Sequence, residues 1–262
     1  MQPKIEPYGE VMMTEHLHSA HDGCDGQGDH AHHVPHDNDA PADGAMLAAE
    51  FLPAPTDPRI LLTLPADKRD AVQCLWMLAF RLTKLLDDVR EPMIGQIKLA
   101  WWRDMMAMLG AQPDALPQGE PLLADFQKHF HGVAGIEALV DAAEAMLLAE
   151  DATEQEVAAT AFGHCLFSLS MRCTAGSNGV DAHVGQAWGL LWGAYVQRGS
   201  EDGATLLAAA GDCAKLRPAQ YGAGQRGWLM LDRLAGQIGR ADGARDLRRE
   251  GLLMLRIGLF GR

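Results

Sequence analysis

Three carboxylates close together in the chain, Asp87, Asp88 and Glu91, are the strongest candidates for chemistry in this sequence. Asp87 and Glu91 are four residues apart, so they share one face if a single helix carries both. Carboxylate oxygens are the ligands that Mg²⁺ prefers, and the bound ion bridges readily to phosphate groups. The cluster therefore predicts a magnesium site at Asp87 and Asp88 if the protein is an enzyme, and a solvated, charged helix end if it is not.

A second set of candidate metal ligands is the histidine-rich segment at the beginning of the sequence, where imidazoles alternate with Asp, Gly and Asn. Imidazole suits Zn, Ni and Cu, so metal handling by this segment is one hypothesis for the function. The segment has almost nothing to bury. We therefore expect residues 1–45 to be a disordered tail and residues 46–262 to form a single folded domain. The four most closely spaced imidazoles are those of His30, His32, His33 and His36.

Charge is distributed unevenly along the 262 residues, whose formal net charge is −13. Residues 1–50 carry ten acidic and one basic side chain, whereas residues 213–262 carry ten basic and four acidic ones. The acidic balance argues against a nucleic-acid partner for the body of the protein. The five cysteines show no CxxC spacing, and no run of about 18 apolar residues occurs. We therefore expect a cytoplasmic protein without a membrane span.

Hydrophobic spacing is helical from Asp67 onward, and no segment alternates as a strand does. Pro92 biases Glu91 away from helical dihedrals, which predicts a break between the first helix and the next. The sequence therefore predicts an all-α fold. Apolar residues three and four apart mark the first helix: Val72, Leu75, Ala79, Leu82, Leu86, Val89 and Met93. Later helices are expected near 92–109, 120–130, 133–150, 154–174, 181–198, 201–211, 225–239 and 242–259.

The helix expected at 92–109 is apolar on two sides. Such a helix is normally buried on both of them, so we expect it to be central in the fold. One side holds Ile94, Ile97, Trp101, Met105 and Met108, and the other holds Leu99, Trp102, Met106 and Leu109.

In the helix expected at 181–198, glycine recurs at every fourth position, as Gly185, Gly189 and Gly193. Glycine has no Cβ, so these positions form a smooth groove, which Trp188 flanks. The groove admits either a second helix at close distance or an apolar ligand, and the sequence leaves both readings open.

The last expected helix combines arginines with large apolar residues. Such a helix either docks on the core or rests on an anionic membrane surface, so peripheral membrane contact is one expectation for this end of the chain. Its arginines are Arg245, Arg248, Arg249 and Arg256, and its apolar residues include Leu252, Leu253, Leu255, Ile257, Leu259 and Phe260.

One stretch resembles a known family. Residues 89–106 read VREPMIGQIKLAWWRDMM and follow the apolar helix AVQCLWMLAFRLTKLLDD. This arrangement is similar to the squalene/phytoene synthase family, specifically its divergent bacterial and mitochondrial branch. Weaker similarity in GIEALVDAAEAML and HVGQAWGLL extends the resemblance over roughly residues 59–195. The residues that fit the branch's EP..G.IRLQWWRD hallmark are Glu91, Pro92, Gly95, Ile97, Leu99, Trp101, Trp102, Arg103 and Asp104, with Lys98 in place of the usual Arg.

The resemblance implies a single-domain helical bundle of the isoprenoid synthase type with a central cavity and an isoprenoid or other lipid as ligand. Family synthases join two prenyl diphosphates in that cavity, where several Mg²⁺ ions held by two aspartate-rich motifs neutralise the leaving diphosphate. By this resemblance, the cavity residues are Trp76, Phe80, Thr83, Trp101, Trp102, Gly185, Trp188 and Gly189.

Both metal-binding motifs of the family are incomplete in this chain. In the first, of the form DxxxD, Asp87 fits the last position but Thr83 occupies the first. In the second, the matching segment GLLWGAYVQRGSED has no acidic residue before Glu201 and Asp202. One carboxylate cluster is too few to hold the metals that ionise a diphosphate, so the departures imply a degenerate, non-catalytic member.

The same branch of the family includes proteins associated with assembly of respiratory complex I. The resemblance therefore implies an accessory or assembly factor with a protein partner, located in the cytoplasm or peripheral to the inner membrane. The alternative is a Mg²⁺-dependent prenyl transferase that uses isoprenoid diphosphates and recruits further carboxylates. The candidates for those carboxylates are Asp141, Glu144, Glu201 and Asp202.

Overall fold

The computed structural model describes residues 51–175, 181–216 and 220–261, and every regular element in these ranges is helical. Ten α-helices and three short 3-10 helices form, with no strand among the described residues, so the all-α prediction is confirmed. The α-helices are α2 (Pro58–Leu61), α3 (Arg69–Asp88), α4 (Pro92–Ala111), α5 (Pro121–His129), α6 (Glu137–Leu148), α7 (Ala152–Ala175), α8 (Gln186–Val196), α9 (Glu201–Leu216), α10 (Arg226–Arg240) and α11 (Leu247–Phe260). The 3-10 helices are Ala66–Lys68, Pro113–Ala115 and Ala223–Gln225.

The chain divides into two units, Met1–Asp39 and Ala40–Arg262, and all described residues belong to the second. The domain boundary expected after residue 45 stays a prediction. Four predicted metal ligands lie outside the described residues: His30, His32, His33 and His36.

Helix ends differ from the sequence prediction where local backbone geometry decides them. α6 begins at Glu137, later than expected, because Gly135 has a φ of 93°, outside the helical region. α11 begins at Leu247, because the Asp246 carboxylate accepts hydrogen bonds of 3.1 Å from two backbone N–H groups of the first turn.

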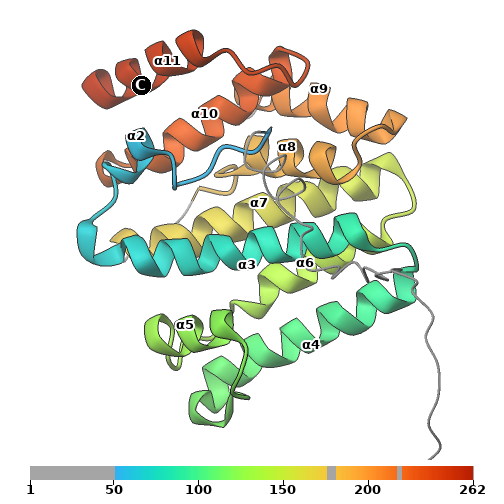
Figure 1. Cartoon of the computed structure of the whole chain (residues 1–262). Coiled ribbons are helices and arrows are strands. Elements are labelled where there is room, and N and C mark those ends of the chain that lie inside the picture. Colours follow the sequence, from blue (N-terminus) through green and yellow to red (C-terminus); the bar gives the residue numbers. More distant parts are fainter. Residues whose placement is uncertain (1–50, 176–180, 217–219, 262) are drawn as a thin grey trace, which may run out of the picture. The chain divides into compact units, whose positions relative to one another are not determined.

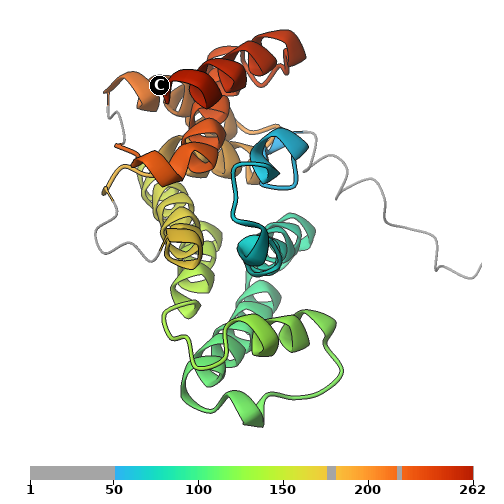
Figure 2. The ribbon, with the colours of Figure 1, turned by 90° about the vertical axis from the view of Figure 1, so that its left-hand side faces the viewer.

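α3 and α7 run beside each other through the middle of the second unit (Figure 1). α6 packs between α7 and α4, while α5 packs against α3. On the other side of α7 lies α8, which contacts both α9 and α10, and α11 packs outermost against α10 (Figures 1 and 2). The helices that resemble the family motifs, α3, α4 and α8, therefore belong to different layers.

The connection between α3 and α4 is extended. Val89 has φ −74° and ψ 119°, and Glu91 has φ −120° and ψ 114°. Pro92 then opens α4 in its first turn, where the missing N–H costs no hydrogen bond. The predicted break is confirmed, and Glu91 consequently does not share a helical face with Asp87.

The prediction that α4 is central is wrong. Its Leu99, Met106 and Leu109 side chains are buried, but Ile97 and Trp101 are exposed. The physical reason is that α4 packs with one face on α6 and has only slight contact with α3 and α5. On its other apolar face Met105 is buried, but Ile94, Ile97 and Trp101 are left exposed by the described residues, and α4 lies at the edge of the bundle (Figure 1).

Four fully buried tryptophans, Trp76, Trp188, Trp192 and Trp228, form much of the core. The Trp76 ring lies 5.0 Å from that of Trp188, edge to face, and 6.3 Å from that of Trp228. Trp192 stacks on Phe162 at 3.8 Å. Each indole N–H also finds an acceptor, as buried indoles require: Ser170 Oγ, Pro53 O, Thr83 Oγ1 and Thr174 Oγ1 respectively.

Glycines bring α7 and α8 into direct backbone contact. A Cβ added to Gly189 would clash with the carbonyl oxygen of Ala159, and one added to Gly163 would clash with the carbonyl oxygen of Gly185. Of the two readings of the glycine groove, helix packing is therefore correct, because α7 fills the space that an apolar ligand would need.

In the described ranges, no helix is both long and apolar enough to cross a membrane.

Candidate functional site

Asp87, the one carboxylate that fits the family's first metal motif, forms an ion pair with Arg198. The Arg198 Nη2 lies 2.7 Å from Asp87 Oδ1 and 2.9 Å from Oδ2. Arg198 follows α8 directly, where its Nη1 donates to the Tyr195 carbonyl at 3.1 Å and its guanidinium lies 4.6 Å from the Tyr195 ring centroid. A fixed positive charge thus stands beside Asp87 at the end of the helix that resembles the second motif.

The other two carboxylates of the cluster do not converge on Asp87. Asp88 follows one position later on α3 and borders the space between α3 and α4, while Glu91 is exposed before α4. No group of three or more His, Cys, Asp or Glu residues in the described ranges is placed to hold a metal ion. The magnesium site at Asp87 and Asp88 therefore stays a prediction, and one of its two carboxylates is already paired with Arg198.

Arg103 of the WWRD motif fastens α4 to α6. Its Nε donates to Asp141 Oδ1 at 2.5 Å, and its Nη2 donates to Glu144. The hydrogen bond that Arg103 donates to Asp141, followed by the one it donates to Glu144, raises the pKa of Arg103. Asp104, by contrast, is exposed. The motif arginine is therefore a packing residue between two helices.

Gly95 of the same motif also serves this contact, because a Cβ there would lie 2.8 Å from Leu147 Cδ2.

The carboxylates that a prenyl transferase would recruit are dispersed. Asp141 and Glu144 are held by Arg103. Asp202 lies in the first turn of α9, where it accepts a hydrogen bond of 3.3 Å from Gln155 Nε2, and Glu201 beside it is exposed. The structure brings none of them to Asp87.

Several predicted cavity residues are packing residues instead. Thr83, at the first position of the incomplete DxxxD motif, is buried, donates to the Ala79 carbonyl at 2.7 Å and accepts from Trp192 Nε1 at 2.8 Å. Trp76 and Trp188 pack against each other in the core. Phe80 and the rim of Trp76 border a small pocket of about 110 Å³ beside Pro55. The pockets seen among the described residues thus separate Trp76 and Phe80 from Trp101 and Trp102, and the shared cavity stays a prediction.

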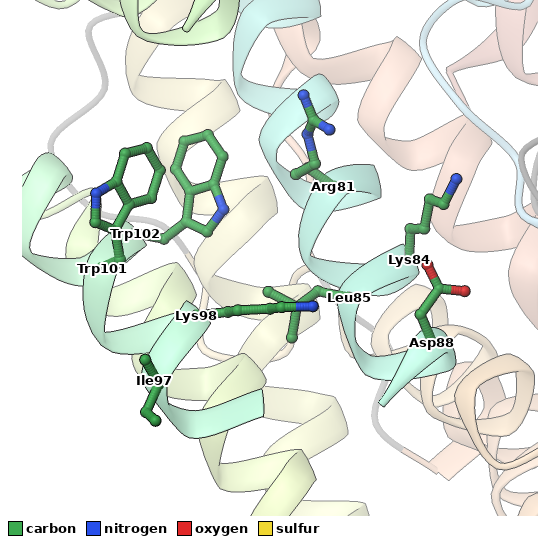
Figure 3. Close-up of a pocket in the computed structure, with 8 residues that line it drawn as sticks. All are labelled: Arg81, Lys84, Leu85, Asp88, Ile97, Lys98, Trp101 and Trp102. Atoms are coloured by element: carbon green, nitrogen blue, oxygen red, sulfur yellow. The ribbon is translucent and has the colours of Figure 1, made fainter. Parts of the chain in front are cut away.

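Trp101 and Trp102 do border a larger space, a groove of about 460 Å³ between α3 and α4 (Figure 3). Their rings meet edge to face at 4.9 Å. Lys98 extends across the groove from α4 toward Leu85 of α3 (Figure 3). The full lining, called the α3–α4 groove below, is Arg81, Lys84, Leu85, Asp88, Ile97, Lys98, Trp101 and Trp102.

On the α3 side of this groove the sequence motifs included Asp88 but missed Arg81, Lys84 and Leu85. Arg81, Lys84, Leu85 and Asp88 are three, one and three residues apart, which places them along one face of α3. That spacing was visible in the sequence, but the family pattern directed attention to Thr83 and Asp87, which point to α8.

A buried acid, Asp232 of α10, was also missed. Its Oδ1 accepts the backbone N–H of Trp188 at 3.3 Å, and it is hydrogen-bonded to Tyr221, whose hydroxyl accepts the Gly185 N–H at 3.2 Å. Burial is the main cause that raises the pKa of Asp232 to about 6. The signal was a lone acid inside the apolar run GWLMLDRLAGQIG. Asp232 anchors the start of α8 to α10.

Cys165 and its neighbour His164 on α7 are structural residues. Burial raises the pKa of the Cys165 thiol to about 12, so it does not form the thiolate that nucleophilic chemistry needs. His164 Nδ1 lies 3.2 Å from the Val184 carbonyl oxygen.

No family model matches the chain, and neither the curated proteins nor the solved structures yield a match.

Proposed function

We propose that this chain is a degenerate member of the squalene/phytoene synthase family that acts without catalysis, as an accessory or assembly factor. The observation that carries the proposal is the Arg198–Asp87 ion pair. A synthase needs carboxylates from both motifs to bind metal ions around a leaving diphosphate. Here the end of the second motif's helix supplies a guanidinium, which stays charged at any physiological pH and occupies the remaining carboxylate.

The alternative, a Mg²⁺-dependent prenyl transferase, lacks support from the positions of the acids. Its candidate carboxylates Asp141 and Glu144 are neutralised by Arg103 at the α4–α6 contact. Thr83 stands where the first motif would place an aspartate, and its hydroxyl oxygen accepts a hydrogen bond from the Trp192 indole N–H. The described residues therefore offer no group of three or more ligands for a magnesium cluster.

We place the protein at an anionic membrane surface, with α11 as the contact. Leu252, Leu255 and Leu259 are exposed and lie three and four residues apart on one face of α11. The only acid of α11, Glu250, is buried and bonded by Arg245 at 2.5 Å and 2.7 Å. The exposed charges of α11 are therefore all positive, which complements anionic headgroups. They are carried by Arg248, Arg249 and Arg256.

Assembly of respiratory complex I is the accessory role that the family resemblance suggests. Two features support a role of this kind over an enzymatic one: the motif residues Gly95 and Arg103 fasten α4 to α6, and the exposed apolar face of α4 is available to a partner. An inner membrane supplies both the anionic surface and the partner.

The first test is turnover. The purified full chain is incubated with farnesyl or geranylgeranyl diphosphate, with and without Mg²⁺, and pyrophosphate release is measured. We expect none above the protein-free control. Mg²⁺-dependent release that Asp87→Asn abolishes would show that the protein is an enzyme and overturn the proposal.

The second test is genetic. Cells from which the gene is deleted should contain less assembled complex I on native gels. Both the wild-type chain and the Asp87→Asn/Arg198→Gln double variant should restore it, because the pair is not used in chemistry. Normal complex I levels in the deleted cells would refute the assembly role.

A further inference from the structure

α4 carries an uncovered apolar stripe that the packing of the bundle does not explain. Its members are Met93, Ile94, Ile97 and Trp101, with exposed fractions of 72%, 48%, 65% and 41%. Positions 93, 97 and 101 are four residues apart, so they follow one face of the helix for about 12 Å. Scattered exposed apolar residues are common, but a continuous row on one helix is typical of an interaction surface.

The stripe continues into the α3–α4 groove, which gives it depth. Ile97 and Trp101 belong to both, and Leu85 of α3 and the buried Trp102 supply further apolar lining (Figure 3). A second hollow of about 410 Å³ between α3 and α5 shares Arg81 with the groove. The two hollows therefore meet at Arg81 on α3.

Two lysines flank this apolar surface, and the part of the chain that the structure describes gives neither of them an ionic partner. Lys84 and Lys98 are exposed, and neither forms an ion pair with a described residue. Arg81, the third cation of the groove, is already held by Glu120 at 3.1 Å. The groove thus presents two unneutralised ammonium groups beside aromatic and aliphatic side chains, which is complementary to an acidic amphipathic segment.

The neighbouring acids indicate a protein and not a bilayer as the occupant. Glu91 precedes the stripe, Asp104 follows Trp101, and Asp88 borders the groove; all three are exposed. An anionic lipid surface would be repelled by these carboxylates, whereas the exposed charges within α11 are positive and its exposed N-cap carboxylate, Asp246, is paired with Arg249 at 3.3 Å. A partner helix can place its own acids opposite the lysines alone.

We propose that the α3–α4 groove is the docking site for an amphipathic helix of a protein partner, with apolar residues on the stripe and carboxylates opposite Lys84 and Lys98. This inference deepens the proposed accessory function and rests on it. Helices bound in grooves are recognised through apolar anchors three, four and seven residues apart. Trp101 has a rigid aromatic ring that lines the groove, and side chains of this kind often supply much of the binding energy of an interface.

The test is site-specific photo-crosslinking in cells that express the full chain. A photoreactive phenylalanine analogue replaces Ile97, and the crosslinked peptide is identified by mass spectrometry. We expect one dominant protein partner, crosslinked within a segment that carries apolar residues at helical spacing and several acids. The control is the same analogue at Val157 of α7, which is also exposed but outside the groove and should not yield this peptide.

Charge dependence gives the second arm of the test. Lys84→Glu/Lys98→Glu should lower the yield of the crosslink about tenfold or more, since like charges then face each other. Lys84→Arg/Lys98→Arg should keep it. The matched control Lys68→Glu/Lys128→Glu reverses two exposed lysines outside the groove and should also keep it. Unchanged thermal unfolding of the variants shows that folding is not the cause.

Three results would overturn the inference: crosslinks to lipid, crosslinks to a second copy of this chain, or a partner whose yield ignores the reversal at Lys84 and Lys98. In each case, absence of pyrophosphate release would still agree with the non-catalytic function. The partner would then bind a surface other than the α3–α4 groove. Release of pyrophosphate would refute that function whatever the crosslinks show.

Discussion

The indole N–H of Trp192 on α8 lies 2.8 Å from Thr83 Oγ1 on α3, and the same hydroxyl donates to the Ala79 carbonyl at 2.7 Å. Thr83 stands at the first position of the family's DxxxD pattern, where a synthase would carry a metal-binding aspartate. In this chain a hydroxyl links two core helices at that position.

Removing this hydroxyl should destabilise the fold. Thr83→Val keeps the shape of the side chain but leaves the buried Trp192 N–H without its acceptor, at a cost of about 1–3 kcal/mol. Thr83→Ser keeps the hydroxyl acceptor, so its free energy of unfolding should fall by less than that of Thr83→Val. Urea unfolding monitored by circular dichroism measures both, and equal losses in the two variants would show that the hydrogen bond contributes nothing.

Breaking the Arg198–Asp87 pair should change stability little, because the Arg198 side chain is 45% exposed. We expect Arg198→Gln to lose less than about 1 kcal/mol. We also expect no Mg²⁺-dependent rise in the melting temperature of either the wild type or the variant, since Asp87 belongs to no group of three or more potential metal ligands among the described residues. A rise of several degrees with Mg²⁺ in Arg198→Gln alone would show that the guanidinium only masks a metal site.

Stability should depend on pH through Asp232. Burial raises its pKa from the ordinary value of 3.8 to about 6, so the folded chain binds a proton that the unfolded chain releases as pH rises through this window. The contribution of Asp232 to the free energy of unfolding is therefore largest below pH 4 and declines up to about pH 6, by on the order of 3 kcal/mol.

Asp232→Asn removes this titration while keeping an acceptor for the Trp188 N–H. Relative to the wild type, the variant should therefore have a higher free energy of unfolding at pH 7 than it has at pH 4. Urea unfolding of both proteins across this range checks the expectation, and a difference that stays constant with pH would contradict it.

The α7–α8 contact should not tolerate a methyl group. Gly189→Ala places a Cβ against the Ala159 carbonyl, which belongs to the backbone of a packed helix, so we expect a loss of about 3 kcal/mol or failure to fold. Gly258→Ala on α11 is the matched control, because its Cβ would lie 3.6 Å from Met230 Cε, an ordinary contact. Higher helix propensity should make that variant up to about 1 kcal/mol more stable. Thermal unfolding compares the two.

Membrane binding should depend on α11. Leu255→Glu/Leu259→Glu is expected to reduce cosedimentation with vesicles of phosphatidylserine and phosphatidylcholine about tenfold or more, because it removes apolar contacts and adds negative charge. Leu62→Glu, at an equally exposed leucine beside α2, should bind as the wild type does. Binding that is the same with pure phosphatidylcholine vesicles would contradict the role of the arginines.

The sequence alone located the helices from α3 to α11, though neither α2 nor every helix end, because these helices depend on local features. Apolar spacing located α3 through α11, and Pro92 located the break between α3 and α4. The same reasoning was wrong about the position of α4 in the bundle. Whether Ile97 and Trp101 are buried depends on which neighbouring helix reaches them, and that is not a local property.

The candidate site was decided only by the tertiary structure. Asp87 and Arg198 are 111 positions apart, and Arg103 meets acids 38 and 41 positions away. Sequence motifs listed these residues but did not pair them, because pairing depends on which faces of α3, α4, α6 and α8 meet when the tryptophan core packs. A charged side chain in a folded protein acts as a metal ligand, as one half of an ion pair between helices, or as a solvated surface group. Which of these it does depends on the charge opposite it, and only the packing of the helices determines that charge.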